Sequence, residues 1–265
     1  MSAGDRGQAT VEWTALVLAV ALALAVVTFA ATRAGAWGLG DSIVDAIVCA
    51  AGDGCPNAVE DAYGDRIASM VRRYAPNIAY EPHSAQLPVD FRRCRETSCA
   101  NASDRAVAVG ESAAGLRVTA FTRVVDRRDR GGNLYLQYWL YYPESFTAGI
   151  GRALGPLVHR WPGYHADDWE GYQIRVAPDG SVAARATAHG GYSHRGWVNW
   201  TGWYRVSGGS HAGQVVAAGA GERTTPASSL RIVPLESLNG TDAFRFHISP
   251  PWRKTVYSDP EAASS

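Results

Sequence analysis

The stretch from Trp13 to Ala31 constrains this chain most, because its nineteen residues carry no charge. As a helix that rises 1.5 Å per residue it would be roughly 28 Å long, close to the bilayer's hydrocarbon thickness of about 30 Å. A secretory signal peptide has a basic start and a shorter apolar core, of about 7–15 residues. We therefore expect a transmembrane helix, and a single-pass protein of the cell membrane.

The residues just before this span, "RGQATVEW", resemble the prepilin signal of type IVb pilins and pseudopilins. In those proteins a prepilin peptidase cuts after a glycine, and a glutamate stands fifth in the mature chain. The resemblance implies cleavage after Gly7, a new N-terminus at Gln8, Glu12 in the fifth position, and other pilin-like subunits as partners. The alternative is an uncleaved anchor in which Glu12 reaches the membrane interface.

The four cysteines indicate which compartment holds the rest of the chain. They follow the span in two close pairs, Cys49 with Cys55 and Cys94 with Cys99. Even numbers at short spacings favour local disulfides, and neither pair has the two-residue spacing typical of a zinc site. We expect two disulfides and an extracytoplasmic C-terminal domain.

The charge balance excludes one class of partner. Lys and Arg together number 25, as do Asp and Glu, so the formal net charge is zero. Such a chain has no large basic field to hold a polyanion. We expect no nucleic acid as a partner.

Beyond the span, the pattern predicts short helices and then strands. Amphipathic helices are expected near 43–48 and 58–74, and alternating runs at 116–128, 133–143, 197–207, 230–235 and 244–249. Many strands without intervening helical periods predict a mainly β fold, specifically a β-sandwich. The expected organisation is a signal and transmembrane helix in 1–36, a helical stalk in 37–76, a β-sandwich in 77–258 and a disordered tail in 259–265.

The segment "YHADDWEGYQIRV" (164–176) begins with a histidine and three acids around one tryptophan, and then continues as a strand. Side chains alternate along a strand, so Asp168 and Glu170 share the face of Ile174. Two carboxylates at the mouth of a core repel each other and lose hydration. We expect a positive charge between them.

The hairpin over 170–189 suggests the source of that charge. With a turn of two or four residues around Asp179, Glu170 would face His189, and His165 would arrive from the preceding loop. Imidazoles opposite carboxylates predict a divalent-cation site, without distinguishing Ca, Mg and Zn. Further candidate ligands are Asp167, His194 and His211. The same register places Arg185 on the face of the acids, so the alternative is an arginine that balances them without a metal.

Two resemblances bear on this segment. "YHADDWEG" resembles the heptapeptide of the necrosis- and ethylene-inducing-like proteins, whose first histidine, aspartate and glutamate help hold a divalent cation. Those roles map onto His165, Asp168 and Glu170. The departures at Tyr164, Ala166 and Asp167 mean that the toxin activity of that family does not follow.

A longer resemblance is to the vacuolar-protein-sorting-related domain family, the "sixty-two" group of plants, fungi and bacteria. Its blocks correspond, in order, to "YWLYYP" (138–143), "HADDWE" (165–170), "AHGGYSH" (188–194) and "GGSHAG" (208–213). The resemblance implies a β-sandwich with the candidate ligands His165, Asp168, Glu170, His189 and His211 around one pole. It implies no settled activity.

A binding module fits the sequence better than an enzyme. Ser210 and His211 are neighbours, which point to opposite faces of a strand, and the nucleophile motif G-x-S-x-G is missing. A cation ringed by aromatic side chains would recognise a polar lipid or a glycan. The aromatic candidates are Trp161, Tyr164, Tyr192, Trp197, Trp200 and Trp203. The alternatives are a metal-dependent hydrolase, with Asp167 or His194 as general base, and a pilus-associated structural subunit.

Overall fold

The computed structural model describes residues 57–82, 86–97, 110–145, 165–188, 190–193, 196–238 and 250–261. The chain divides into two compact units, 1–57 and 58–265. The predicted transmembrane span, the prepilin-like signal and the helix expected at 43–48 lie outside the described residues, as does the strand expected at 244–249. Within the described ranges, no helix is long and apolar enough to span a membrane.

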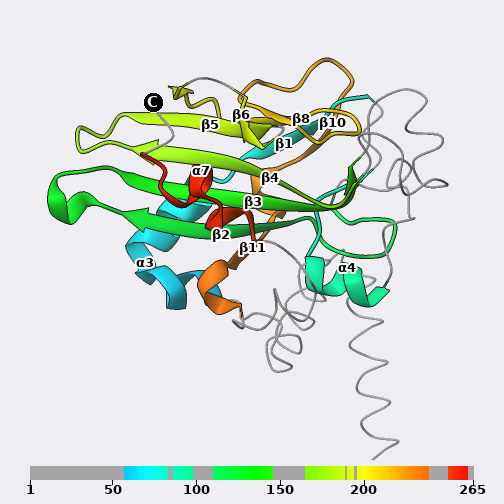
Figure 1. Ribbon diagram of the computed structural model, residues 1–265, viewed down its shortest axis with the longest axis horizontal. Coiled ribbons are helices and arrows are strands. Elements are labelled where there is room, and N and C mark those ends of the chain that lie inside the picture. The colour runs from blue at the N-terminus through cyan, green and yellow to red at the C-terminus, as the bar shows by residue number, and fades with distance from the viewer. Residues whose placement is uncertain are drawn as a thin grey trace, which may run out of the picture. The chain divides into compact units, whose positions relative to one another are not determined.

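The described part of the second unit is mainly β, with two mixed sheets and short helices (Figure 1). The larger sheet has the order β11-β2-β3-β4-β5-β6, and β7 pairs with β5. Its strands are β2 (Thr119–Asp126), β3 (Leu134–Ser145), β4 (His165–Val176), β5 (Val182–Ala188), β6 (Gly191–Tyr192), β7 (Val198–Asn199) and β11 (Arg231–Pro234). The mainly β prediction is confirmed.

The smaller sheet has the order β10-β1-β8-β9. Its strands are β1 (Asn77–Tyr80), β8 (Trp203–Val206), β9 (Gly213–Gln214) and β10 (Arg223–Thr225). The pairs β1–β8 and β11–β2 are parallel. The described helices are α3 (Ala58–Arg73), α4 (Phe91–Thr97), α7 (Thr255–Ser258) and the 3-10 turns η3 (Arg128–Arg130), η4 (Ala227–Ser229), η5 (Leu235–Ser237) and η6 (Pro251–Arg253).

One hydrophobic core is shared by both sheets and α3. Because side chains alternate along a strand, β3 contributes every second residue from Leu134 to Tyr142 to this core. Tyr204 comes from β8, and Val71 comes from α3. The helix expected at 58–74 therefore exists as α3, but it packs into the sheet core, and the compact unit begins ahead of the predicted boundary at 77.

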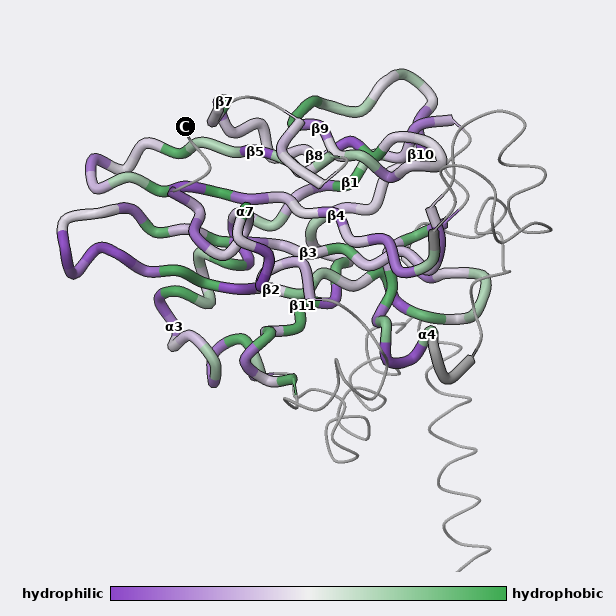
Figure 2. Tube along the Cα trace, in the orientation of Figure 1, coloured by the Kyte–Doolittle hydropathy of each residue, from purple (hydrophilic) through white to green (hydrophobic). Residues whose placement is uncertain are grey.

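A second core covers the other face of the larger sheet. Trp139 and Tyr141 of β3 pack there with Phe91 of α4 and with Tyr257 of the C-terminal segment. Figure 1 shows α7 (red) lying across the larger sheet, and Figure 2 shows that the β2–β3 turn is hydrophilic. With a core on each face, every residue of β3 is buried.

Residues 259–261, the start of the predicted disordered tail, are held against the larger sheet. Arg127 forms an ion pair with Asp259 at 2.9 Å. The Tyr135 hydroxyl donates to Glu261 Oε1 at 2.7 Å, and Arg185 Nη2 donates to the Pro260 carbonyl at 2.8 Å. Residues 259–261 are thus held by contacts with side chains, and not by pairing with a strand.

The predicted register of the β4–β5 hairpin is wrong by one residue. Ile174 pairs with Ala184, and the Ala177 amide donates to the Ser181 carbonyl at 2.9 Å, which leaves a loop of three residues, 178–180. Gly180 has φ 83°, the left-handed conformation that closes three-residue hairpins. The predicted Glu170–His189 pairing is therefore not the register of this hairpin.

The corrected register also moves Arg185 to the opposite face. Arg185 pairs with Gln173, and it therefore lies on the face of the sheet opposite to Ile174. Its guanidinium donates to Gln173 Oε1 at 3.1 and 3.2 Å and to the Tyr192 hydroxyl at 2.9 Å. The alternative in which Arg185 balances the two acids is wrong.

Candidate metal centre

The β3–β4 pair positions both predicted carboxylates at one end of the larger sheet. Asp168 lies opposite Tyr142, and Glu170 lies opposite Leu140. Asp168 is 6% exposed and Glu170 is 5% exposed. The sequence thus correctly identified two acids two residues apart in a buried strand.

Trp169, between the two acids, points into the second core. Its ring lies 5.2 Å from that of Tyr141, 5.4 Å from that of Trp252 and 5.6 Å from that of Phe91. The next residue on that face is Gly171, where a Cβ atom would lie 2.9 Å from Cζ3 of Trp139. Tight aromatic packing on one side of β4 therefore fixes the acids on the other.

Asp167 interrupts the ladder between the two strands. Its φ is 61°, a left-handed conformation that aspartate tolerates better than most residues. The Tyr141 hydroxyl donates to Asp167 Oδ1 at 2.7 Å. Because Tyr141 belongs to the second core, this contact holds Asp167 on the side away from Asp168.

His211 reaches the site from the loop between β8 and β9 in the other sheet. Its Nδ1 lies 2.9 Å from Asp168 Oδ2, and its ring stacks on Tyr142 at 4.0 Å and 3°. The residue is 0% exposed and has φ 54°. A left-handed, fully buried histidine is a strained arrangement, of a kind that gathers at functional sites. The structure thus brings one of the additional candidates directly to Asp168.

Glu170 receives a hydrogen bond but no ion pair among the described residues. The Thr187 hydroxyl donates to Glu170 Oε2 in a short contact, and the Gly171 amide donates to Thr187 Oγ1 at 2.6 Å. Burial, and then the charge of Asp168, raise the pKa of Glu170 well above its ordinary value. Lys254 and the Thr187 hydrogen bond act in the opposite direction. The second carboxylate is therefore costly to ionise in this protein as it stands.

Three buried polar atoms near the acids have no hydrogen-bond partner in the described part of the chain. They are the hydroxyls of Tyr142 and Tyr204 and the Nε2 atom of His211. Burial raises the pKa of both phenols, and the charges of Glu170 and Asp168 add to that effect. Sequence reasoning did not single out these tyrosines.

The other predicted ligands lie outside what the structure describes. The backbone of His165 pairs with Ser145, but its side chain is not described, and neither are His189 and His194. Within the described ranges, no group of three or more His, Cys, Asp and Glu side chains could hold a metal ion. Cys94 is buried in α4, while Cys49, Cys55 and Cys99 lie outside the described residues, so both disulfide pairs stay predictions.

Of the aromatic residues expected around the acids, Trp197 and Trp200 have contacts with other residues. Trp197 packs between Arg175 and Arg185, 5.2 and 4.2 Å from their guanidinium carbons, and its ring is 5.8 Å from that of Tyr135. Tyr135 is seven residues before Tyr142 on β3, roughly 23 Å along the strand.

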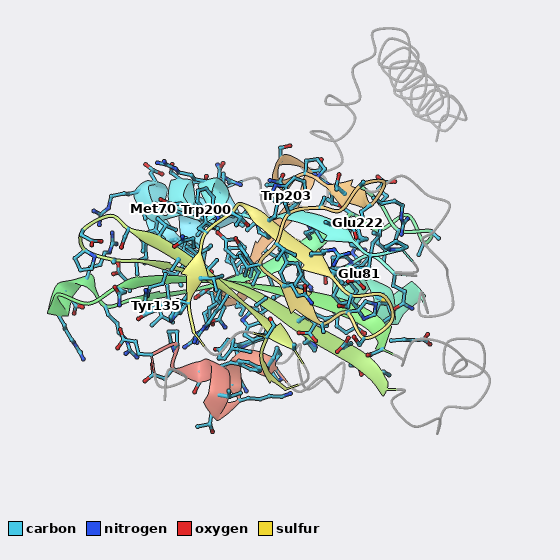
Figure 3. The ribbon with its side chains drawn as sticks, turned by 90° about the horizontal axis from the view of Figure 1, so that it is seen from above. Met70, Glu81, Tyr135, Trp200, Trp203 and Glu222 are labelled. Carbon is cyan, nitrogen blue, oxygen red and sulfur yellow. The ribbon has the colours of Figure 1, made fainter. Side chains whose placement is uncertain are left out.

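Trp200 likewise serves packing. It lies edge-on to Tyr74 at 5.1 Å, and, like Met70 of α3, it packs against the core shared by both sheets (Figure 3). The contacts described for these two rings are with Tyr74, Tyr135 and arginines, and an aromatic surround of the acids stays a prediction.

Comparison with known proteins does not assign a family or a function to this chain. No family model matches the chain, and no curated protein matches it. One solved structure, described as "Toxin fold for microbial attack and plant defense", is similar with a TM-score of 0.43 and 16% sequence identity. The alignment covers 76% of this chain and 91% of that one. A TM-score of this size does not establish a common fold, so the site is interpreted from its own geometry.

Proposed function

We propose that this protein binds a divalent cation at the N-terminal half of β4, with Asp168 and Glu170 as carboxylate ligands. The observation that carries the proposal is the burial of both acids without an ion pair to Glu170 in the described residues. Buried carboxylates are costly unless they are paired or bind a metal. Hard divalent cations prefer carboxylate oxygens, so a bound ion would offset this cost.

The remaining ligands in this proposal come from histidines. His165 begins β4, three residues before Asp168, and His189 follows the last residue of β5. The contact between His211 Nδ1 and Asp168 supports the site from the other sheet. Such outer contacts orient metal-binding side chains and are common around protein metal sites.

We further propose that the domain displays this cation outside the cell membrane. The uncharged span at 13–31 would anchor the chain, and the pairs Cys49–Cys55 and Cys94–Cys99 would form disulfides in that compartment. The cation held by Asp168 and Glu170 would recognise a polar lipid head group or a glycan. The prepilin-like residues 6–13 favour a prepilin peptidase and pilin-like subunits as further partners.

Calorimetric titration of the full-length chain in detergent tests the cation site. After removal of bound metal with a chelator, the wild type is expected to bind one divalent cation, and Asp168→Asn is expected to lose that binding. Asp129→Asn is a suitable control, because the Asp129 side chain is 72% exposed. A wild type that binds no cation, or an Asp168→Asn variant that binds it as tightly, contradicts the proposal.

A further inference from the structure

A row of polar side chains crosses the larger sheet beside the second core. Arg123 of β2 lies opposite Gln137 of β3, and Gln173 of β4 lies between Gln137 and Arg185 of β5. Residues directly opposite each other share a face of the sheet, so these four residues form one polar row. Gln137, Gln173 and Arg185 are at most 1% exposed. Buried polar groups need hydrogen-bond partners, so whatever covers the polar row must supply them.

The C-terminal segment, residues 250–261, covers the polar row and supplies acceptors from its main chain (Figure 1). Gln137 Nε2 donates to the Tyr257 carbonyl at 3.1 Å. Arg123 Nη1 donates to the Ser258 carbonyl at 3.0 Å. Every peptide carries such carbonyls, so these contacts recognise a peptide main chain and do not depend on its side chains.

Tyr257 anchors the segment on the sheet. Its ring lies edge-on to Trp139 at 5.1 Å and edge-on to Tyr192 at 5.4 Å. Its hydroxyl donates to the Gly191 carbonyl at 3.0 Å, and the residue is only 4% exposed. A buried aromatic side chain between two aromatic rings is the kind of contact that dominates the energy of a peptide interface.

Two groups of the polar row are poorly satisfied by this segment. The Arg185 guanidinium lies 3.7 Å from the Tyr192 ring centre and 4.2 Å from that of Trp197, and its described acceptors are neutral oxygens of Gln173, Tyr192 and Pro260. Gln173 Nε2, beside it, has no acceptor in the described part of the chain. A buried cation is stabilised most by an anion, so the position of the Pro260 carbonyl calls for a carboxylate.

We propose that the polar row binds the free C-terminus of a partner peptide, and that residues 250–261 cover this site until the partner displaces them. A peptide that ends at the position of Pro260 places a carboxylate oxygen where that carbonyl lies, 2.8 Å from Arg185 Nη2. Its second oxygen is then available to Gln173 Nε2. The partner carries an aromatic residue three positions before its end, in the place of Tyr257. This inference does not depend on the cation site.

The contacts that the partner gives up lie near the surface. Arg127 pairs with Asp259 and with Glu261, and the three side chains are 33%, 44% and 41% exposed. Exposed ion pairs contribute little to stability, whereas a charge-assisted hydrogen bond to a buried guanidinium is strong. The chain's own segment has the advantage of its tether, which acts as a millimolar effective concentration. The terminal carboxylate offsets that advantage.

A pair of peptides that differ only at the C-terminus tests the proposal. The variant Tyr257→Ala, made in the full-length chain in detergent, frees the polar row, and fluorescence anisotropy measures its binding of a labelled peptide of residues 250–260, PPWRKTVYSDP. The peptide with a free carboxylate is expected to bind about tenfold more tightly, or better, than the same peptide with a terminal amide. The wild type, whose own segment competes, is expected to bind the acid form at least about tenfold more weakly than the variant does. Adding Arg185→Gln to Tyr257→Ala is expected to equalise the two peptides.

Tyr257→Ala that binds neither peptide, or binds both equally, overturns the proposal. If this variant does not unfold cooperatively, hydrogen exchange of the wild type decides. The acid peptide, at a millimolar concentration comparable with that of a tethered segment, is expected to speed exchange of the amides of residues 255–261 more than the amide peptide does. Exchange that neither peptide changes overturns the proposal as well.

Discussion

Replacing Glu170 with glutamine is expected to stabilise the cation-free protein and to abolish its response to cations. Glutamine keeps the shape of the side chain, and its carbonyl oxygen can still accept from the Thr187 hydroxyl. It carries no charge into a site where burial and Asp168 raise the pKa of Glu170. If Glu170 is a cation ligand, its buried charge should destabilise the protein while no cation is bound.

The pH dependence of this effect has a definite sign. The ordinary pKa of the glutamate is 4.5, and the folded value lies well above it. Between the two values the folded state binds more protons than the unfolded state, so the free energy of unfolding of the wild type falls as pH rises through this window. The advantage of Glu170→Gln is therefore near zero at a pH below 4.5 and full above the folded pKa. Removing one costly buried charge gives roughly 1–3 kcal/mol.

Thermal unfolding of the full-length chain, followed by near-UV circular dichroism, measures both effects. An advantage of about 1–3 kcal/mol corresponds to a melting temperature about 2–12 °C higher, at 2–4 °C per kcal/mol for a domain of this size. A cation at a hundred times its Kd adds about 2.7 kcal/mol to the wild type and nothing to the variant. A cation-free Glu170→Gln protein that melts below the wild type at pH 7.5 would refute the reasoning.

Three further predictions concern packing and processing. Gly171→Ala is expected to lower the free energy of unfolding in urea by about 1–3 kcal/mol, because its Cβ would lie 2.9 Å from Trp139. Gly196→Ala is the control and should leave the free energy of unfolding unchanged, because the space around its Cβ is open. Equal losses in the two variants would contradict this prediction. Arg185→Lys is expected to lower the free energy of unfolding by roughly 2–4 kcal/mol, since lysine lacks the planar fork; an unchanged urea midpoint would show that these contacts are dispensable. Mass spectrometry of the mature protein is expected to find Gln8 at the N-terminus, and an intact leader would rule out prepilin processing.

The strands could be predicted because their signals are local. Alternation along β3 and β4 fixes which residues share a face, and this correctly placed Asp168 with Glu170. The register of the β4–β5 hairpin could not be fixed in the same way, because it depends on whether the loop has two, three or four residues. The structure has a three-residue loop closed by the left-handed Gly180, and in this register Arg185 lies on the other face.

The composition of the site depended on contacts distant in sequence. His211 meets Asp168 across 43 positions, from a loop of the other sheet. That meeting follows from the pairing and packing of the sheets, including the parallel pairing of β1 with β8, which no hydrophobic period encodes. For the same reason, the sequence did not predict that Tyr204 lies near the acids. By sequence it is an ordinary core tyrosine, and only the packing of the two sheets brings it to the site.

The most direct test of the cation site is to locate the ion. Crystals of the protein grown with Mn²⁺ and measured for anomalous scattering are expected to show one peak within about 2.0–2.6 Å of carboxylate oxygens of both Asp168 and Glu170. A map without a peak near Asp168 and Glu170, or with an arginine or lysine side chain between them, would contradict the account.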